Sequence, residues 1–316
     1  MSGIKPQNRR FLSFGAFFAC IMLLLAACGN SGNTNNGSTN AVAPKNCPHP
    51  ISLSKITVGV IPAESQTSVV GETQPFATAL SKQICKPVEV FVGTNYTAVI
   101  TAMSNGKADL ANFGPLSYVL ASQEGGIQAI SLALAEKTKA TSYQSYIITT
   151  PKTGIKTVQD LKGKTFSFVD PASTSGNLEP RYMMKQAGLN ADTDVKGSYI
   201  GSHDASLLAV LSGKVNAGAV ASDTYNHLLQ EGKFKAGDLS IVKKSDPIPE
   251  DPMAVRKGMS QSDMASLQKA LLALNDNPDA AKAIGAGGFG PGDDSLYNGI
   301  RALAKSLNID LKKVAG

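Results

Sequence analysis

Short apolar runs and helical spacings alternate along the chain from Ile51 onward. Ile56–Ile61 is a short β-branched run of the kind that forms a buried strand, and a helical stretch follows over Thr73–Cys85. Segment 96–105 repeats apolar residues at the spacing of one helix face. Further strands are predicted over residues 88–92, 109–113, 127–134, 143–150, 165–169, 198–200 and 215–220. Further helices are predicted over 114–121, 260–275 and 294–307. Three more helices are predicted to end at Ala187, at Leu211 and at Gln230.

This alternation of strands and helices predicts an α/β fold with largely parallel sheets. The alternation restarts near Thr165, which predicts two lobes, although no sequence repeat relates them. Hydrophobic residues make up 42% of the chain and charged residues 17%. The chain therefore has enough apolar material for a sizeable core, and too little charge for a disordered protein.

The N-terminal segment has the pattern of a secretory signal peptide over residues 1–27. A basic segment over residues 5–10 precedes an apolar stretch over 11–27 that ends in small residues. A transmembrane anchor is the alternative. However, the stretch is barely long enough to span a bilayer, and Ser13 and Gly15 interrupt it.

Leu25-Ala26-Ala27-Cys28 resembles the bacterial lipobox, in which the cysteine is lipidated on sulfur and becomes the mature N-terminus. Every residue from Gly29 to Asn40 is Gly, Asn, Ser or Thr, so this segment behaves as a flexible tether. Residues 28–50 are therefore predicted to be a lipidated tether. It would hold an exported domain near a membrane, in the periplasm or on the outer face of the cytoplasmic membrane.

The net charge of +6 does not indicate a nucleic-acid partner. Lys5, Arg9 and Arg10 leave with the signal peptide, after which 27 basic residues face 24 acidic ones, a balance of +3. That balance is too mild for an electrostatic nucleic-acid footprint.

The cysteines favour one disulfide. Cys20 leaves with the signal peptide and Cys28 carries the lipid, so Cys47 and Cys85 remain. An exported domain commonly pairs its cysteines, and the alternative is two free thiols. No CxxC or HxxxH spacing occurs, so no metal site is predicted. The nucleotide-binding motifs GxxxxGK[ST] and GxGxxG are absent, no cofactor is predicted, and the absence of GxSxG weakens a serine hydrolase.

Residues 170–177 follow the predicted strand 165–169 and precede a helix. Ser173, Thr174 and Ser175 offer hydroxyls there, and the first backbone N–H groups of a helix are unpaired, so the segment predicts an anion site. Plain capping is the alternative. Gly176 is expected to let a ligand approach the backbone, and Pro180 places the helix start near Gly176 or Asn177.

Seven segments together carry a more specific signal: residues 63–66, 95–100, 106–111, 113–118, 173–180, 201–205 and 246–252. In this order they resemble the phosphonate and phosphite solute-binding proteins of ABC importers, the PhnD-type family, from about Ile56 to Gly290. The resemblance implies a two-lobed type II periplasmic-binding-protein fold, with a mainly parallel sheet in each lobe and the ligand in the cleft. Residues 51–147 and 245–316 would form lobe 1, and residues 148–244 lobe 2.

The resemblance also implies a set of binding residues. Three hydroxyls would hold a phosphorus oxyanion, two tyrosines and a histidine would assist, and two aspartates would face the ligand's substituent, such as an amine. These residues are Ser173, Thr174, Ser175, Tyr96, Tyr143, His203, Asp223 and Asp251. The alternatives are a helix-start residue for His203, a core residue for Tyr143 and a helix cap for Asp223. Phe113 is a candidate for an aromatic wall.

The function that the resemblance implies is binding without catalysis. The protein would be an extracytoplasmic lipoprotein that captures phosphite, a phosphonate or phosphate. Its lobes would close by hinge bending and deliver the ligand to an ABC permease with a cytoplasmic ATPase. One alternative is a binding protein for sulfate or an organic carboxylate. Another is an anchored hydrolase that uses Ser175, His203 and Asp223 as nucleophile, base and orienting group.

Ligand preference is predicted from the fourth substituent on phosphorus. An aromatic wall of Tyr96, Tyr143 and Phe113 would tolerate hydrogen or methyl, whereas a hydroxyl needs an acceptor. We therefore expect phosphite or a short phosphonate to bind at least tenfold more tightly than phosphate, about 1.4 kcal/mol. The choice between phosphite and an aminophosphonate stays open.

Overall fold

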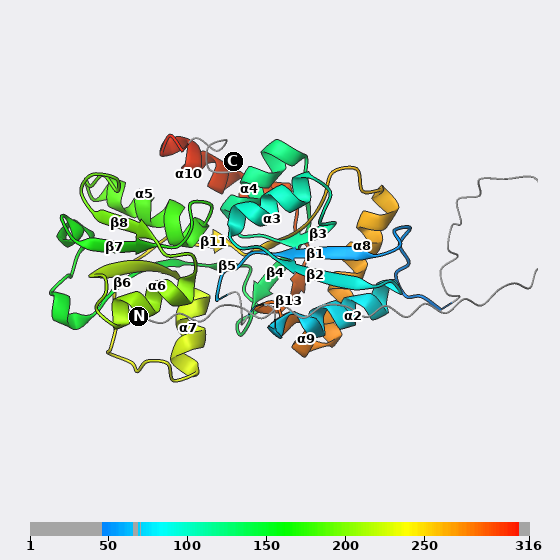
Figure 1. The fold of residues 1–316 in the computed structure, drawn as a ribbon, viewed down its shortest axis with the longest axis horizontal. Coiled ribbons are helices and arrows are strands. Elements are labelled where there is room, and N and C mark those ends of the chain that lie inside the picture. Colours follow the sequence, from blue (N-terminus) through cyan, green and yellow to red (C-terminus); the bar gives the residue numbers. More distant parts are fainter. Residues whose placement is uncertain (1–45, 66–68, 70, 310–316) are drawn as a thin grey trace, which may run out of the picture. The chain divides into compact units, whose positions relative to one another are not determined.

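The structure, a computed structural model, describes residues 46–65, 69 and 71–309. Within this part of the chain two main sheets are each covered by helices (Figure 1), which confirms the predicted two-lobed α/β fold. The first sheet has six strands in the order β13-β4-β12-β3-β1-β2, and we call this sheet with its helices lobe 1. The strands are β1 (Ile56–Val60), β2 (Val88–Val92), β3 (Leu110–Asn112), β4 (Gln128–Ala135), β12 (Pro252–Val255) and β13 (Ala286–Gly290).

The first sheet is mixed, with parallel pairs at one end of the strand order and antiparallel pairs at the other. Strand β1 pairs in parallel with β2 and β3, because α2 and α3 form the crossovers that bring the chain back in the same direction. Strand β12 arrives from the other lobe and inserts between β3 and β4, antiparallel to both. Strand β13 is antiparallel to β4.

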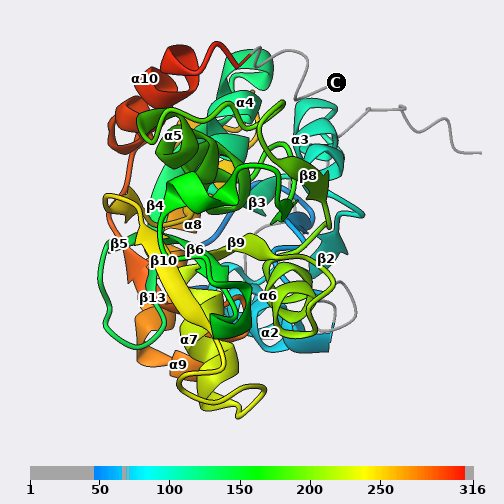
Figure 2. The same ribbon diagram turned by 90° about the vertical axis from the view of Figure 1, so that its left-hand side faces the viewer.

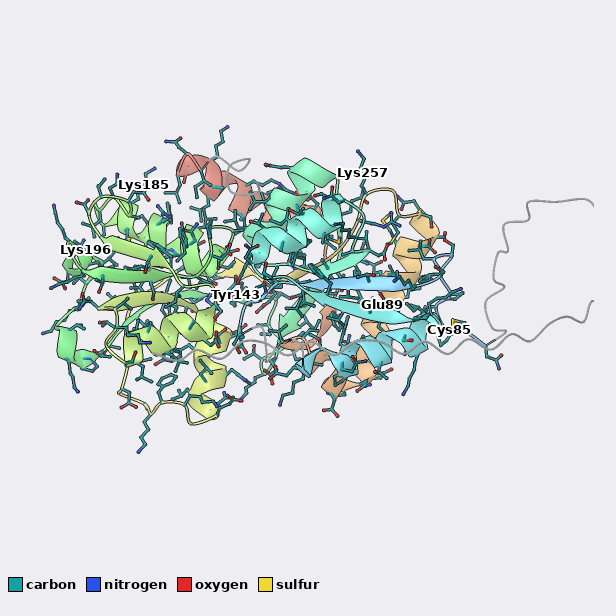
Figure 3. The ribbon with its side chains drawn as sticks, in the orientation of Figure 1. Cys85, Glu89, Tyr143, Lys185, Lys196 and Lys257 are labelled. Atoms are coloured by element: carbon teal, nitrogen blue, oxygen red, sulfur yellow. A yellow bond between two sulfur atoms is a disulfide. The ribbon has the colours of Figure 1, made fainter. Side chains whose placement is uncertain are left out.

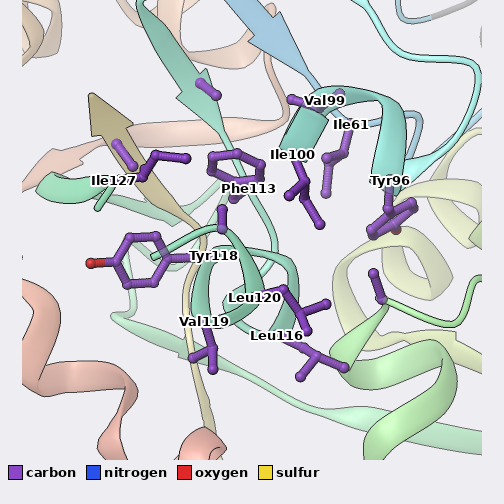
Figure 4. Close-up of a cluster of buried hydrophobic side chains, with 14 of the residues drawn as sticks. Ile61, Tyr96, Val99, Ile100, Phe113, Leu116, Tyr118, Val119, Leu120 and Ile127 are labelled. Carbon is purple, nitrogen blue, oxygen red and sulfur yellow. The ribbon is translucent and has the colours of Figure 1, made fainter. Parts of the chain in front are cut away.

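Helices cover both faces of this sheet. On one face α2 places Phe76, Leu80 and Ile84 in one apolar row against the sheet, together with α8 and α9. On the other face α3, α4 and α10 build a second cluster, shown in Figure 4. Their bounds are α2 (Gln74–Ile84), α3 (Tyr96–Ser104), α4 (Pro115–Gly125), α8 (Gln261–Ala273), α9 (Pro278–Lys282) and α10 (Asn298–Ser306).

The second sheet, with its helices, is lobe 2. Its five strands have the order β10-β6-β9-β7-β8. It is also mixed, because β6 is antiparallel to β9 and β10 while β7 is parallel to β8 and β9. Helix α5 packs on one face, and α6 and α7 pack on the other (Figures 1 and 2). The elements are β6 (Ser145–Thr149), β7 (Thr165–Phe168), β8 (Lys196–Tyr199), β9 (Ala217–Ala221), β10 (Ser240–Lys244), α5 (Glu179–Gln186), α6 (His203–Leu211) and α7 (Ser222–Gln230).

The chain crosses between the lobes twice. The two crossing segments pair with each other through the short strands β5 (Ser142–Tyr143) and β11 (Ile248–Pro249). Strand β6, which begins at Ser145, already belongs to the second sheet, so the expected change of lobe between residues 147 and 148 falls inside a strand. Both crossings therefore lie beside the same part of the molecule, where the site described below is found.

Among the strands and α-helices of the described residues, five were not predicted: β10, β11, β12, β13 and α9. The sequence of β13, Ala-Gly-Gly-Phe-Gly, has a low β propensity, and β12 begins at a proline. Helix α9 spans only Pro278–Lys282. Tertiary burial, and not local propensity, stabilises β12 and β13, since every residue of these two strands is buried.

A disulfide joins Cys47 and Cys85, with the Cα atoms 5.9 Å apart, as expected. It links the segment before β1 to the C-terminus of α2, where Cys85 adopts a left-handed backbone conformation with φ of 54°. The predicted signal peptide, the lipidated Cys28 and most of the tether lie outside the described residues. Among the described residues, none of the helices has the length and apolar character needed to cross a bilayer.

Candidate ligand-binding site

A cavity of about 750 Å³ is lined by residues of both lobes. All eight residues predicted to bind the ligand line this one cavity. They are Tyr96 and Asp251 from lobe 1, Tyr143 from the crossing segment β5, and Ser173, Thr174, Ser175, His203 and Asp223 from lobe 2. Figure 3 labels Tyr143 between the two sheets. Residues separated by up to 155 positions thus meet at one place, as the resemblance implied.

The three hydroxyl residues open a π-helical turn, Thr174–Leu178, that continues into α5. The Ser173 hydroxyl caps this turn by accepting a hydrogen bond from the Gly176 N–H at 3.0 Å. The capping alternative therefore holds for Ser173, which also lines the cavity. The helix begins at Thr174, slightly earlier than predicted, while Pro180 lies in the first turn of α5 as expected.

Close packing explains why residue 176 is a glycine, which differs from the predicted reason. A Cβ atom at this position would lie 2.3 Å from the Val169 Cβ and 2.8 Å from the Ser173 hydroxyl oxygen. Both neighbours belong to the same strand–turn unit, so glycine is required for the turn to pack against the end of β7. Ligand access does not explain this glycine.

Thr174 connects the site to lobe 1. Its hydroxyl oxygen accepts the Leu116 backbone N–H at 2.8 Å, at the N-terminus of α4. Nearby, the Asp170 carboxylate accepts the Tyr96 backbone N–H at 3.4 Å. A hydroxyl that accepts one hydrogen bond keeps its own hydrogen to donate. The Thr174 hydroxyl can therefore link the lobes and still donate to a bound anion.

The two tyrosines lie beside the serines. The Tyr96 phenol is close to Ser173, and the Tyr143 phenol is close to Ser175. Burial raises the pKa of both phenols, and the carboxyl of Asp251 raises it further. Both therefore stay neutral and keep a hydroxyl hydrogen. Tyr143 is half-buried and packs against the core cluster of Figure 4 while it also lines the cavity, and Tyr96 belongs to that cluster.

His203 begins α6 and is 4% exposed. Its backbone N–H donates to the Ala63 carbonyl at 2.9 Å, which is another link to lobe 1. Its Nδ1 accepts the Ala221 backbone N–H at 3.1 Å. Burial lowers the pKa of the imidazole to about 4, so the ring is neutral and its proton sits on Nε2. His203 is thus both a helix-start residue and a neutral donor in the cavity wall.

These bonds contradict the hydrolase alternative. A triad would need the His203 Nδ1 to donate to Asp223, but this nitrogen accepts a backbone N–H instead. The side-chain partners of Asp223 are Ser222, at 3.3 Å, and Glu250. Ser175, His203 and Asp223 therefore line one cavity without forming a catalytic relay.

Three carboxyl groups line the same cavity. Asp223 lies in the first turn of α7 but does not cap it, since no side-chain bond caps this helix. Burial raises the pKa of Asp223, and burial together with the Asp223 charge raises that of Asp251 to about 7. Glu250, which the sequence did not single out, is 7% exposed and lies beside Asp223. Burial raises the pKa of Glu250 to about 10.

Glu250 could have been noticed in the sequence, because it lies inside the quoted segment 246–252 directly before Asp251. Consecutive residues in an extended chain normally point to opposite sides, which hides one of them. Here the segment between β11 and β12 is irregular, and both side chains line the cavity. Phe113 is the opposite case: it lies in the core cluster of Figure 4, fully buried, and the proposed aromatic wall does not include it.

Charged side chains line the outer part of the cavity. Glu136 contacts His227 at 3.9 Å and Lys282 at 3.8 Å, and His227 contacts Glu231 at 3.4 Å. These residues come from the end of β4, α7 and α9, and none of them was predicted. Across the described part of the chain, no group of acidic, histidine or cysteine side chains is arranged to hold a metal ion.

Comparison with known proteins adds a family. The model of the ABC transporter phosphonate periplasmic substrate-binding protein family matches residues 58–297. The chain is 32% identical over 308 residues to the phosphate-import protein PhnD of Mycolicibacterium smegmatis, covering 90% of this chain and 92% of the relative. It is 26% identical to the phosphonates-binding periplasmic protein of Escherichia coli, covering 75% and 71% of the two chains.

Solved structures support the same fold. A binding protein of an ABC phosphonate transporter from Pseudomonas aeruginosa matches with a TM-score of 0.74 at 25% identity, covering 80% of this chain and 86% of that one. A Prochlorococcus marinus protein in complex with methylphosphonate matches with a TM-score of 0.72 at 23% identity, covering 81% and 98%.

Proposed function

This chain belongs to the family of periplasmic substrate-binding proteins of phosphonate ABC transporters, and we propose that its cavity captures a small phosphorus oxyanion for import. The main support for this proposal is that six hydrogen-bond donors line one cavity. They are three hydroxyls, two neutral phenols and a neutral imidazole. Donors of this kind suit the oxygens of a tetrahedral anion, because bonds to charged oxygens are short and strong.

The binding step makes and breaks no covalent bond. The contacts of Thr174, Asp170 and His203 with lobe 1 are those that hinge opening would break and closure would restore. We propose that the closed state is the one delivered to the permease, whose partner is a cytoplasmic ATPase. Relatives named for phosphate import, phosphonate binding and probable phosphite binding support this ligand class.

Titration calorimetry of the mature protein tests the ligand class. Phosphate, phosphite, methylphosphonate and 2-aminoethylphosphonate are titrated beside sulfate and acetate. We expect at least one phosphorus oxyanion to bind more than tenfold more tightly than sulfate or acetate. Sulfate or acetate binding as tightly as the best phosphorus compound would instead favour the wider class of small oxyanions.

Anchoring through Cys28 is a further part of this proposal, supported by the lipobox-like sequence and by the periplasmic family. Replacing Cys28 with Ser removes the sulfur that would carry the lipid. The Cys28→Ser protein is then expected in the soluble extracytoplasmic fraction, while the native protein stays with membranes. Equal membrane association of both proteins would reject the anchor and leave the ligand proposal intact.

A further inference from the structure

Three carboxyl groups line a cavity that the proposed function assigns to an anion: Asp223, Glu250 and Asp251. Among the described residues, none of the three forms an ion pair with a lysine, arginine or histidine. Two unit charges of the same sign about 4 Å apart repel by about 4 kcal/mol near a protein surface. Fully ionised, this group would oppose binding of a phosphorus oxyanion.

Protonation of Glu250 would reduce this repulsion between the carboxyl groups and the bound anion. The side chain of Glu250 is 7% exposed beside the carboxyls of Asp223 and Asp251, and carboxyl groups buried this close together cannot all be ionised. Two hydrogen bonds hold the backbone of Glu250 in place. Its N–H donates to the Thr141 carbonyl at 3.0 Å, and its carbonyl accepts the Tyr297 hydroxyl at 3.0 Å.

Within the described part of the chain, one carboxyl oxygen of Glu250 lacks a hydrogen-bond partner. The Glu250 Oε1 is buried and has no hydrogen-bond partner among the described residues, although the side chain lines the cavity. An unpaired buried acceptor is unfavourable, because it has given up its hydrogen bonds to water. When the proton is on the other carboxyl oxygen, Oε1 is a carbonyl oxygen that only a hydrogen-bond donor can satisfy.

The groups around Glu250 give it no positive neighbour. Asp223 comes from α7, Asp251 follows it in the chain, Glu136 follows β4, and Tyr143 and Tyr297 come from β5 and the turn before α10. The acids can only favour protonation, and the two phenols are neutral because burial raises the pKa of each. Nothing in this set would drive the proton off Glu250 at neutral pH.

Resting on the proposed function, we propose that Glu250 is a specificity residue: it binds as a neutral acid and offers Oε1 to a donor on the ligand. A phosphate hydroxyl and the ammonium group of an aminoalkylphosphonate share this donor chemistry. Hydrogen or methyl on phosphorus offers no donor. This ranking differs from the sequence-based expectation, because that expectation relied on an aromatic wall of Tyr96, Tyr143 and Phe113 and did not include Glu250.

A pH series of calorimetric titrations with phosphate tests the neutral acid. The series runs from neutral pH to above the pKa of about 10 that burial gives Glu250. Deprotonation adds a charge beside the anion, so the affinity of the native protein should fall at least tenfold over this range. Glu250→Gln keeps the shape and cannot ionise, so its affinity should match the native value at neutral pH and then change only as far as the ionisation of phosphate itself requires, without the additional fall of the native protein. Glu89→Gln, on exposed β2, should follow the native curve.

Ligand comparison tests the donor. Phosphate or 2-aminoethylphosphonate should bind the native protein at least tenfold more tightly than methylphosphonate, and the tighter of the two identifies the source of the donor. Glu250→Met removes the acceptor and should reduce the difference in affinity between the donor ligand and methylphosphonate. Parallel pH curves for the native and Glu250→Gln proteins, or methylphosphonate binding as tightly as both donor ligands, would overturn this inference alone. Absence of binding by every phosphorus oxyanion would overturn the proposed function and this inference with it.

Discussion

Two walls of the cavity differ in how far the protein satisfies them before a ligand arrives. On the donor wall, Ser173 caps its own turn, Thr174 bonds Leu116 and His203 bonds Ala221. On the acidic wall, Asp223, Glu250 and Asp251 face one another without a cation among the described residues, and one oxygen of Glu250 has no partner.

This difference indicates that the two walls contribute differently to affinity and to selectivity. The donor wall is held in place by bonds within the protein, so it is preorganised for oxygen atoms that every tetrahedral oxyanion has. It cannot tell phosphate from a phosphonate. The acidic wall is unsatisfied, and what satisfies it depends on the fourth substituent of the ligand. Affinity should therefore depend mainly on the first wall and selectivity on the second.

Making both walls acidic should have the largest effect. Ser175→Asp places a carboxylate among the donors, and repulsion of the anion should cost about 3 kcal/mol or more, over about a hundredfold in affinity. Ser175→Asn is the control, because it has nearly the same size without the charge. Calorimetry with phosphate compares the two, and thermal unfolding verifies that both are folded. Similar losses in both variants would assign the effect to volume and not to charge.

Removing the imidazole should have the next largest effect. His203→Ala leaves the oxygen that it serves without a donor and should weaken binding by about 1–3 kcal/mol. Since burial lowers the pKa of His203 to about 4, the ring stays neutral around pH 7 and should add no pH dependence there. The native and His203→Gln proteins should thus show parallel pH profiles near neutrality. An affinity that rises on mild acidification only in the native protein would indicate a protonated imidazole instead.

Shortening the donor wall should weaken all ligands alike. Ser175→Ala removes one hydroxyl and should cost about 1 kcal/mol for phosphate, phosphite and both phosphonates. The order of the four ligands should stay unchanged, in contrast to the change expected for Glu250→Met. Ser262→Ala, on the exposed side of α8, is the matched control. A reordering of the ligands in Ser175→Ala would contradict the division between the walls.

The outer ion pairs should matter least. The side chain of Lys282 is 65% exposed where it contacts Glu136, and exposed pairs contribute at most about 1 kcal/mol. Lys282→Met should therefore change phosphate affinity less than about fivefold in calorimetry at physiological salt. A larger loss would mean that the donor wall extends into this outer region.

Much of the fold could be predicted from local patterns. Helix α2 keeps its apolar residues in one row, and β2 coincides with the predicted run Val88–Val92. Strands β12 and β13 could not be predicted, since their short or glycine-rich sequences form strands only by pairing with partners distant in the sequence. The antiparallel direction of β12 depends on the return of the chain from lobe 2, which no local pattern encodes.

The sequence by itself determined the chemical types at the site and their local order. Ser173, Thr174 and Ser175 follow a strand and open a helix because near neighbours decide turns and caps. Only the tertiary structure decided which distant groups they meet and which of those carry protons. Thr174 meets Leu116 across 58 positions, and Glu250 meets Asp223 across 27. Protonation depends on burial and on charges close in space, and chain folding alone sets both.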